Sequence, residues 1–284
     1  IRYATPGNPM ISIVIPNKDH YKDLNLCVTS VLKKSTYRNF EIIIVENNST
    51  EKETFDYYNK IQKEYDNVRV LTWEREFNYS AINNFGVKEA KGDYILLLNN
   101  DTKILDKDSL GDMLGYCMRP EVGIVGSKLI YGDGTIQHAG VILGLGGIAG
   151  HAFIGLDAKE HGYMSRAYLS CDFTAVTAAC LMVPKAVFDE VGGLCEEYAV
   201  AFNDVDLCMK VRSKGYLVVY DAFSQWYHYE SKSRGLEDTP EKVARFNKEI
   251  QIFERRWPDI MRDGDPYYNP NLTLKSQDFS LKRI

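Results

Sequence analysis

Short apolar runs alternate with amphipathic stretches over the first hundred residues. The apolar runs lie at residues 11–15, 40–45, 68–71 and 95–98. Runs of this length are typical of strands buried on both faces, although one such run taken alone also fits a buried helix segment. The stretches predicted as helices lie at 24–32, about 52–65 and 80–90, the last one capped by Asn78 or Ser80. Because strand and helix alternate three times, we expect a parallel sheet with right-handed crossovers.

The pattern changes after residue 101. The predicted elements are then a helix at 105–118, an extended segment at 122–131, a strand at 178–183, a helix from Pro184 to Val191, a helix at 204–213 and a strand at 216–220. A glycine-rich segment runs from residue 140 to residue 155, and we interpret residues 136–153 as a mobile loop. Near the end, Thr239-Pro240-Glu241 provides an N-cap, a proline at the first helical position and an early acid. Apolar residues follow at helical spacing, and we expect them to pack in the core; they are Val243, Phe246, Ile250, Phe253 and Trp257.

No linker, internal repeat or low-complexity segment interrupts the 284 residues, so we expect one domain with a mobile tail after about residue 266. The chain begins with Ile1 rather than Met, and we expect it to be excised from a longer protein. Its 45% hydrophobic and 26% charged residues are those of a globular protein. The net charge of −5 and the lack of a basic block argue against nucleic acid as a partner. No apolar stretch approaches the ~20 residues that span a bilayer.

Six cysteines are spread along the chain without any CxxC pair, most of them in apolar surroundings. Reduced, buried thiols in a cytoplasmic protein are the favoured interpretation, and a disulfide framework is the alternative. No signal peptide is visible in the sequence.

Acid and amide side chains directly follow two of the predicted strands. Glu46-Asn47-Asn48 comes after the second strand and Asn99-Asn100-Asp101 after the fourth. Ligands of open α/β sheets bind outside the carboxyl ends of the strands. One carboxylate with amide oxygens beside it suits a hard divalent ion shared with a substrate phosphate, whereas the alternative is an Asx-rich turn. No GxGxxG or Walker motif is present, so phosphate chemistry here would be metal-assisted.

Two further polar positions are candidates for a catalytic or ligand-binding role. Asp204 lies at the start of a predicted helix, where the helix dipole favours the ionised carboxylate that a general base needs. The alternative is that Asp204 only caps the helix and that Asp206 is a first-turn acid. His228 places one imidazole just after the last predicted strand, as a ligand or as a packed residue.

Together these segments resemble a family 2 glycosyltransferase with a GT-A fold, over about residues 10–281. The matching segments are 13–18 with Asp19 for the opening strand and its loop, 45–50 for the acid-rich nucleotide segment, 78–86 for the entry to the metal strand, 99–101 for the DxD motif, 203–204 for the base motif, and 136–153 and 228–235 for the polysaccharide-assembling branch. Glu46 replaces the usual Asp of the nucleotide segment, and Asn99 stands at the first acidic place of DxD.

The resemblance implies a role for each of these residues. Donor-nucleotide binding is implied for Pro16, Asn17, Asp19, Glu46, Asn48, Asn83, Asn99 and Asn100. Asp101 and His228 would hold Mg²⁺ or Mn²⁺, and Asp204 would be the general base, while Asp206 orders the start of its helix. An acceptor or phosphate loop is implied for His138, His151, Asn203, Asp206, Lys232 and Arg234.

The implied activity is inverting transfer of a sugar from a UDP- or dTDP-linked donor to a hydroxyl of a growing bacterial surface glycan, with rhamnosyltransferases among such relatives. Residues 1–101 would bind the nucleotide sugar, 102–265 the acceptor, and 266–284 would be the tail. We expect a cytoplasmic location, with any contact to the inner face of the plasma membrane and to a lipid-linked acceptor supplied by flanking regions. The alternatives are an inactive GT-A-like binding module and a sugar-nucleotide pyrophosphorylase, which should have a glycine-rich N-terminal loop that residues 16–24 lack.

Overall fold

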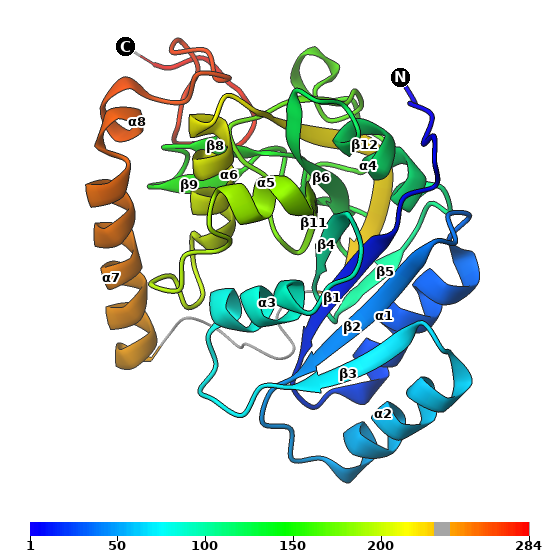
Figure 1. Ribbon diagram of the computed structural model, residues 1–284. Helices are drawn as coiled ribbons and strands as arrows, with labels where there is room; N and C mark the ends of the chain where they lie inside the picture. The colour runs from blue at the N-terminus through cyan, green and yellow to red at the C-terminus, as the bar shows by residue number, and fades with distance from the viewer. Residues whose placement is uncertain (230–238, 284) are drawn as a thin grey trace.

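The computed structural model describes residues 1–229 and 239–283, and the first hundred residues form the parallel part of a sheet (Figure 1). The strands are β1 (Ile11–Asn17), β2 (Phe40–Glu46), β3 (Val68–Thr72) and β4 (Tyr94–Leu98), and the helices are α1 (Tyr21–Lys34), α2 (Lys52–Glu64) and α3 (Tyr79–Lys88). β1 pairs in parallel with β2 and β4, and β2 with β3. The prediction for this half is confirmed, and Asn78 is the cap of α3.

The rest of the chain extends the same sheet. Its elements are β5 (Thr102–Ile104), α4 (Ser109–Cys117), β6 (Val122–Ile130), β7 (Ile136–His138), β8 (Val141–Leu143), β9 (Ala149–His151), β10 (Cys171–Asp172), β11 (Cys180–Pro184), α5 (Lys185–Glu190), α6 (Asn203–Ser213), β12 (Leu217–His228), α7 (Pro240–Arg256) and α8 (Pro258–Asp263). The strand order is β10-β12-β6-β11-β4-β1-β2-β3, with β5 on β12 and β7 on β6. β11 is antiparallel to both of its neighbours, whereas β12 is parallel to β6.

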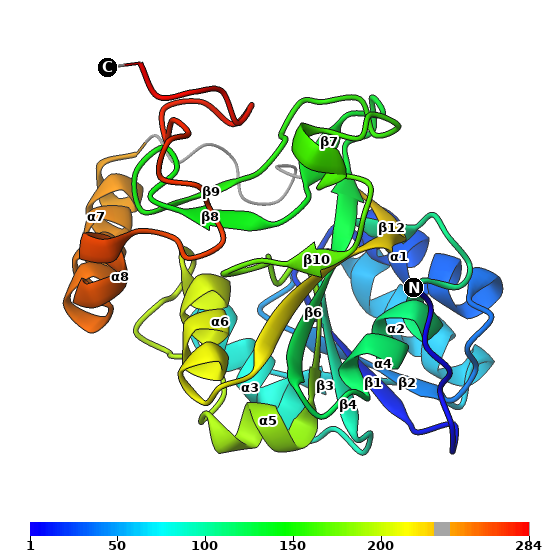
Figure 2. The same cartoon turned by 90° about the horizontal axis from the view of Figure 1, so that it is seen from above.

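Helices cover both faces of the sheet and enclose two apolar cores (Figure 2). One core contains buried residues of α3, α5, α6 and α7, and the other contains those of α1, α2 and α4. All six cysteines are free thiols and four of them are buried, as the sequence predicted. This layering leaves the carboxyl ends of β1, β2 and β4 open to the loops that carry the candidate site.

Three sequence predictions about the second half are wrong. β12 runs to His228 instead of ending at residue 220, because a register shift between Asp221 and Gln225 breaks its apolar pattern without ending the pairing with β6. The glycine-rich segment forms the β8–β9 hairpin, and its apolar residues are buried rather than part of a mobile loop. The segment after residue 266 is not a loose tail, since Tyr268, Leu272 and Phe279 are buried in it.

The apolar stripe of α7 is only partly core. Ile252 and Phe253 are buried, but Val243 and Phe246 near the start of the helix are 44% and 38% exposed. In Figure 1, α7 runs along the outer side of the molecule, away from the central sheet. The expectation that the whole stripe packs in the core is therefore wrong for its N-terminal half.

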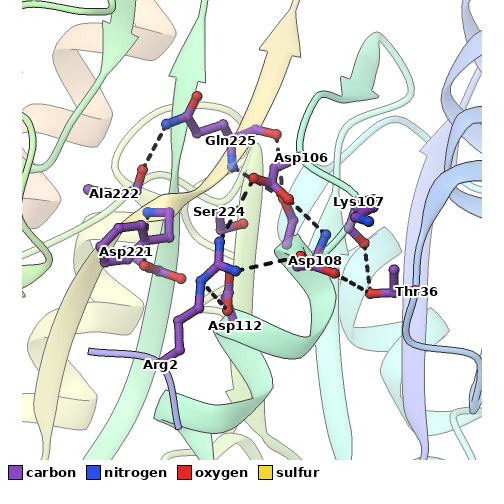
Figure 3. A network of polar contacts seen from close by, with 12 residues as sticks. Arg2, Thr36, Asp106, Lys107, Asp108, Asp112, Asp221, Ala222, Ser224 and Gln225 are labelled. Carbon is purple, nitrogen blue, oxygen red and sulfur yellow. Dashed lines mark hydrogen bonds and ion pairs between the residues drawn. The ribbon is translucent and has the colours of Figure 1, made fainter.

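The segment that precedes β1 is docked on α4. A Cβ atom at Gly115 would lie 2.6 Å from the Tyr3 carbonyl oxygen, so only glycine allows the backbone of Tyr3 to approach α4 this closely. The neighbouring Arg2 forms ion pairs with Asp106, Asp108 and Asp112 (Figure 3). These contacts join the start of the chain to its second half.

Candidate active site

Polar side chains at the ends of β1, β2 and β4 form one hydrogen-bonded chain. The Glu46 carboxylate accepts hydrogen bonds from the Ser49 backbone N–H at 2.7 Å and from the Tyr58 hydroxyl at 2.8 Å. Asn17, which pairs with Glu46 across β1 and β2, donates to that hydroxyl at 2.7 Å and accepts from Asn100 Nδ2 at 2.6 Å. The structure therefore brings together three residues predicted to bind the donor, although Glu46 and Asn17 are themselves buried.

Asp19 and Asn48 hold the loops beside this chain. Asp19 Oδ1 accepts from the backbone N–H groups of Thr50 at 2.7 Å and Glu51 at 2.8 Å. Burial opposes ionisation of this carboxyl, but the two N–H groups outweigh burial, and the pKa of Asp19 lies below its ordinary value. Asn48 has a left-handed φ of 55° and donates to the Arg75 carbonyl at 2.9 Å. Both side chains thus fix loop structure, and their contact with a nucleotide stays a prediction.

Pro16 and Asn83, both predicted to bind the donor nucleotide, do not line the cleft described below. Pro16 lies within β1, opposite Val45 of β2. Asn83 is fully buried in α3, and its Nδ2 donates to the Tyr79 carbonyl at 2.8 Å. Because this amide faces the interior, the structure does not bring Asn83 to the cleft described below.

The antiparallel pairing of β5 with β12 places His228 beside Asp101. His228 lies opposite Thr102 in this pair, and its Nε2 is 3.1 Å from Asp101 Oδ1. Its Nδ1 is 2.9 Å from Gln137 Oε1, which can only accept a hydrogen bond. Nδ1 therefore carries a proton, and Nε2 is the ring nitrogen that faces the carboxylate. Such a contact between a ring nitrogen and a carboxylate oxygen is favourable only with a proton or a cation between the two atoms.

This pair fits a divalent cation that is shared with a substrate. Mg²⁺ and Mn²⁺ take hard oxygen and imidazole ligands, and Mg²⁺ usually keeps several waters while it binds phosphate oxygens beside one or two protein ligands. Asn99 Nδ2 lies 3.3 Å from His228 Nε2, so an amide borders the same position. Within residues 1–229 and 239–283, no group of three or more His, Cys, Asp or Glu side chains could enclose a metal. The donor set therefore fits an ion completed by diphosphate and water.

A cleft of about 180 Å³ lies between the start of α6 and the ends of β4 and β12. Its walls are formed by Tyr79, Asn99, Gln137, His151, Thr177, Ala178, Ala179, Val200, Ala201, Phe202, Asn203, Asp204 and His228. Asp204 Oδ2 accepts from the Ala178 backbone N–H at 3.0 Å, and Oδ1 from that of Val205 at 2.9 Å. The Tyr79 hydroxyl donates to the Ala178 carbonyl at 3.1 Å and lies 3.4 Å from Asn99 Oδ1. The candidate base thus shares one cleft with His228, and Asp101 lies beside His228.

His138 lies behind His151, a residue of the cleft wall, and the two rings meet edge to face. Their Nδ1 atoms are 3.0 Å apart, and His138 Nε2 accepts from the Thr177 backbone N–H at 3.5 Å. Burial, with His151 and His228 nearby, holds the pKa of His138 well below its ordinary value. His138 is therefore neutral, with its proton on Nδ1, and it fixes the orientation of His151 in the wall.

Of the remaining residues predicted for the acceptor or phosphate loop, one lines the cleft and one is buried away from it. Asn203 lines the cleft and donates to the Val200 carbonyl at 2.7 Å. Asp206 neither lines the cleft nor orders the helix start; it is fully buried and accepts from Trp257 Nε1 at 2.9 Å, with Arg256 Nε at 3.1 Å. Burial raises the pKa of Asp206 even though these partners favour the charged form. Lys232 and Arg234 lie outside the described residues.

Sequence reasoning missed Gln137, Tyr79 and the backbone of Ala178 as parts of the site. Gln137 fixes the His228 tautomer, and Ala178 orients the Asp204 carboxylate. The available signal was weak, since Tyr79 and Gln137 lie within the matching segments 78–86 and 136–153 but nothing in the sequence distinguishes them from their neighbours. Their roles depend on the pairing of distant segments.

Comparison with known proteins identifies the class. The chain belongs to glycosyl transferase family 2, whose model matches residues 12–164. An uncharacterized protein of Sinorhizobium fredii is 47% identical over 276 residues, which are 97% of this chain and 30% of that protein. The O-antigen biosynthesis protein RfbC of Myxococcus xanthus is 38% identical over 289 residues, which are 100% of this chain and 22% of that protein. The chain therefore spans less than a third of the length of these relatives.

Solved structures confirm the fold. The crystal structure of GalNAc-T7 with UDP, GalNAc and Mn²⁺ superposes with a TM-score of 0.68 at 14% identity, over 89% of this chain and 51% of that chain. The fold is thus GT-A, with a central sheet flanked by helices, and the family match favours a glycosyltransferase domain over a pyrophosphorylase. None of the helices in the described residues is long and apolar enough to cross a membrane.

Proposed function

We propose that this family 2 glycosyltransferase moves a sugar from a UDP- or dTDP-linked donor to a hydroxyl of a growing bacterial surface glycan, with inversion at the anomeric carbon. The observation that carries the proposal is that Asp204, Asn99 and His228 line one cleft, with Asp101 3.1 Å from His228. A base and a diphosphate-binding position on adjacent walls are what a single displacement requires.

In this proposal Asp204 takes the proton of the acceptor hydroxyl as that oxygen attacks the anomeric carbon from the face opposite the diphosphate. The bond between that carbon and the diphosphate breaks in the same step, so no covalent intermediate forms and the configuration inverts. The N–H groups of Ala178 and Val205 hold the carboxylate in one orientation, which favours the reactive geometry. Asp101 and His228 would hold Mg²⁺ or Mn²⁺, which supplies positive charge beside the leaving diphosphate.

Donor and acceptor classes are inferred from different observations. The hydrogen-bonded chain from Glu46 to Asn100 lies at the strand ends where GT-A proteins hold a nucleotide, and the structure of GalNAc-T7 contains UDP and Mn²⁺. The name of the Myxococcus relative supports an O-antigen-like acceptor, which is lipid-linked in our proposal. We assign His151 and Asn203, both on the cleft wall, to the acceptor side.

The test measures nucleoside diphosphate release from a panel of UDP- and dTDP-linked sugars, with Mn²⁺ or with EDTA. We expect metal-dependent release from one donor class, and we expect Asp204→Asn to lower kcat by roughly 100-fold or more while calorimetry shows unchanged UDP or dTDP binding. Asp56→Asn, whose side chain on α2 is 63% exposed, is the matched control. Full activity in folded Asp204→Asn would exclude Asp204 as the base. Nucleotide binding without release from any donor would favour an inactive binding module, for which Asn99 is the sequence signal.

A further inference from the structure

We infer that Glu249 of α7 is a positioning residue for the general base, an inference that rests on the function proposed above. Glu249 is only 1% exposed. Its Oε1 accepts a hydrogen bond from the Val200 backbone N–H and its Oε2 accepts one from that of Ala201, both at 3.0 Å. Val200 and Ala201 line the cleft and immediately precede α6, the helix that carries Asp204. One buried carboxylate therefore holds the turn that leads into the base.

The local sequence offers no substitute for this carboxylate. Phe202 occupies the N-cap position of α6 with φ 60° and ψ 4°, and no side chain there caps the helix. A non-glycine residue in this left-handed conformation costs on the order of 1 kcal/mol and persists only where its surroundings fix it. Hydrogen bonds from backbone N–H groups to an ionised carboxylate are among the strong ones in proteins. α7 thus supplies the acceptor for the two backbone N–H groups that precede the N-cap residue of α6.

Aromatic side chains of α7 hold the same turn from both sides of Glu249. The Phe202 ring centroid lies 5.5 Å from that of Phe246 and 5.8 Å from that of Phe253. Phe246, Glu249 and Phe253 are three and four residues apart, so they share one face of the helix. Through Glu249 this face of α7 contacts the backbone of Val200 and Ala201, and through its two phenylalanines it contacts the side chain of Phe202.

A shift of this turn would displace Asp204 from its hydrogen bond to Ala178. Misplacement of a reacting group by about 1 Å lowers rates by roughly 100-fold. Glu249 itself is not among the described residues that line the cleft, so donor binding should not depend on it. The expected signature of a positioning role is therefore a lower kcat with an unchanged donor KM.

Glu249→Gln tests this inference at constant side-chain size, because it replaces one accepting oxygen by an NH₂ group that meets an N–H donor. With Mn²⁺ and the donor found in the panel, we expect kcat for nucleoside diphosphate release to fall by roughly 100-fold, while the donor KM and the Kd for UDP or dTDP change by less than about twofold. Glu254→Gln, at an exposed position of the same helix, should keep the original kcat. A folded Glu249→Gln protein with unchanged kcat, or with a donor KM raised in place of a lower kcat, overturns the inference.

Phe246→Ala keeps the test decisive if Glu249→Gln does not fold. Phe246 is 38% exposed, so its truncation should leave the fold intact, and we expect kcat to fall by about 10-fold through the loosened turn. An unchanged kcat in this variant also overturns the inference. Asp204→Asn distinguishes failure of the proposed function from failure of the inference about Glu249. If Asp204→Asn keeps full activity, the proposed base is wrong. If only the α7 variants keep full activity, only the positioning role of Glu249 is wrong.

Discussion

Gln137 determines which nitrogen of His228 is available to a cation. Its Oε1 accepts from Nδ1 at 2.9 Å, and acceptors behind a ligating histidine fix its tautomer and ring orientation. We expect Gln137→Met, which keeps the length of the side chain but removes the acceptor, to weaken Mn²⁺ binding by roughly 10-fold to 100-fold. Calorimetric titration of Mn²⁺ in the presence of UDP measures this effect.

Gln251→Met, at an exposed position of α7, controls for the loss of a glutamine. If the Gln137 variant binds Mn²⁺ as the parent protein does, the tautomer is set elsewhere and the proposed pair of Asp101 and His228 loses its main support.

Residues at strand ends and helix starts could be predicted from the sequence, whereas residues inside helices could not. Asp101 and Asp204 were predicted because they follow a buried strand or open a helix; Asp204 lines the cleft and Asp101 lies beside His228, which lines it. Asp206 lies two residues further along α6, about 200° around the helix from Asp204, and therefore points into the protein. Asn83 is turned inward for the same reason, since helical phase rather than residue type determines which side chains reach the cleft.

At the scale of elements, local pattern predicted the parallel strands of the first hundred residues but not the direction of β11. β11 is antiparallel to β4 and β6 because the chain between β6 and β11 contains no α-helix, only short strands, turns and a 3₁₀ turn, so the crossover rule does not apply to it. The three residues of β5 are too few to give a periodic signal. The pairing of β5 with β12 is nevertheless what places Asp101 beside His228, so the proposed metal site depends on an element that the sequence does not reveal.

α7 is attached to α6 by a second contact, which predicts a stability effect. Trp257 Nε1 donates to the fully buried Asp206 carboxylate at 2.9 Å. Trp257→Phe keeps an aromatic ring but removes the indole N–H from that buried carboxylate and leaves it the Arg256 contact, so we expect a loss of about 1–3 kcal/mol in the free energy of unfolding, measured by urea denaturation. In the control, Trp73→Phe, the lost partner is the backbone carbonyl of Glu76 in an exposed loop, and we expect a smaller loss. Equal losses would assign the effect to ring size.

At the scale of the whole molecule, one sheet combines strands from residue 11 to residue 228. The candidate nucleotide residues come from the first hundred residues, and the base and His228 come from the last ninety. Since the site lies where these segments meet, contacts that join the two halves should matter to the stability of the entire domain. The ion pairs of Arg2 are such contacts (Figure 3).

Arg2 lies 3.3 Å from Asp112 Oδ1 and near Asp106 and Asp108 at 4.0 and 3.5 Å. Burial raises the pKa of Asp112 to about 6, Arg2 lowers it, and the charges of Asp221, Asp106 and Asp108 raise it further. Because this folded-state pKa exceeds the unfolded value of 3.8, ionisation of Asp112 destabilises the fold progressively between about pH 3.8 and 6, and fully above pH 6. The Arg2 guanidinium offsets part of this cost only when Asp112 is charged.

We therefore expect Arg2→Met to lower the free energy of unfolding by roughly 1 kcal/mol at pH 7.5 and by less at pH 5, where Asp112 is mostly protonated in both proteins. Urea denaturation at the two pH values measures the difference. Arg262→Met is the matched control, because Arg262 is 67% exposed and its ion pairs with Asp259 and Asp263 are at the surface, so its loss should be small at both values. An equal loss at pH 5 and pH 7.5 for Arg2→Met would mean that the segment before β1 is held by the packing of Tyr3 on α4, and not by neutralisation of the buried Asp112 carboxylate.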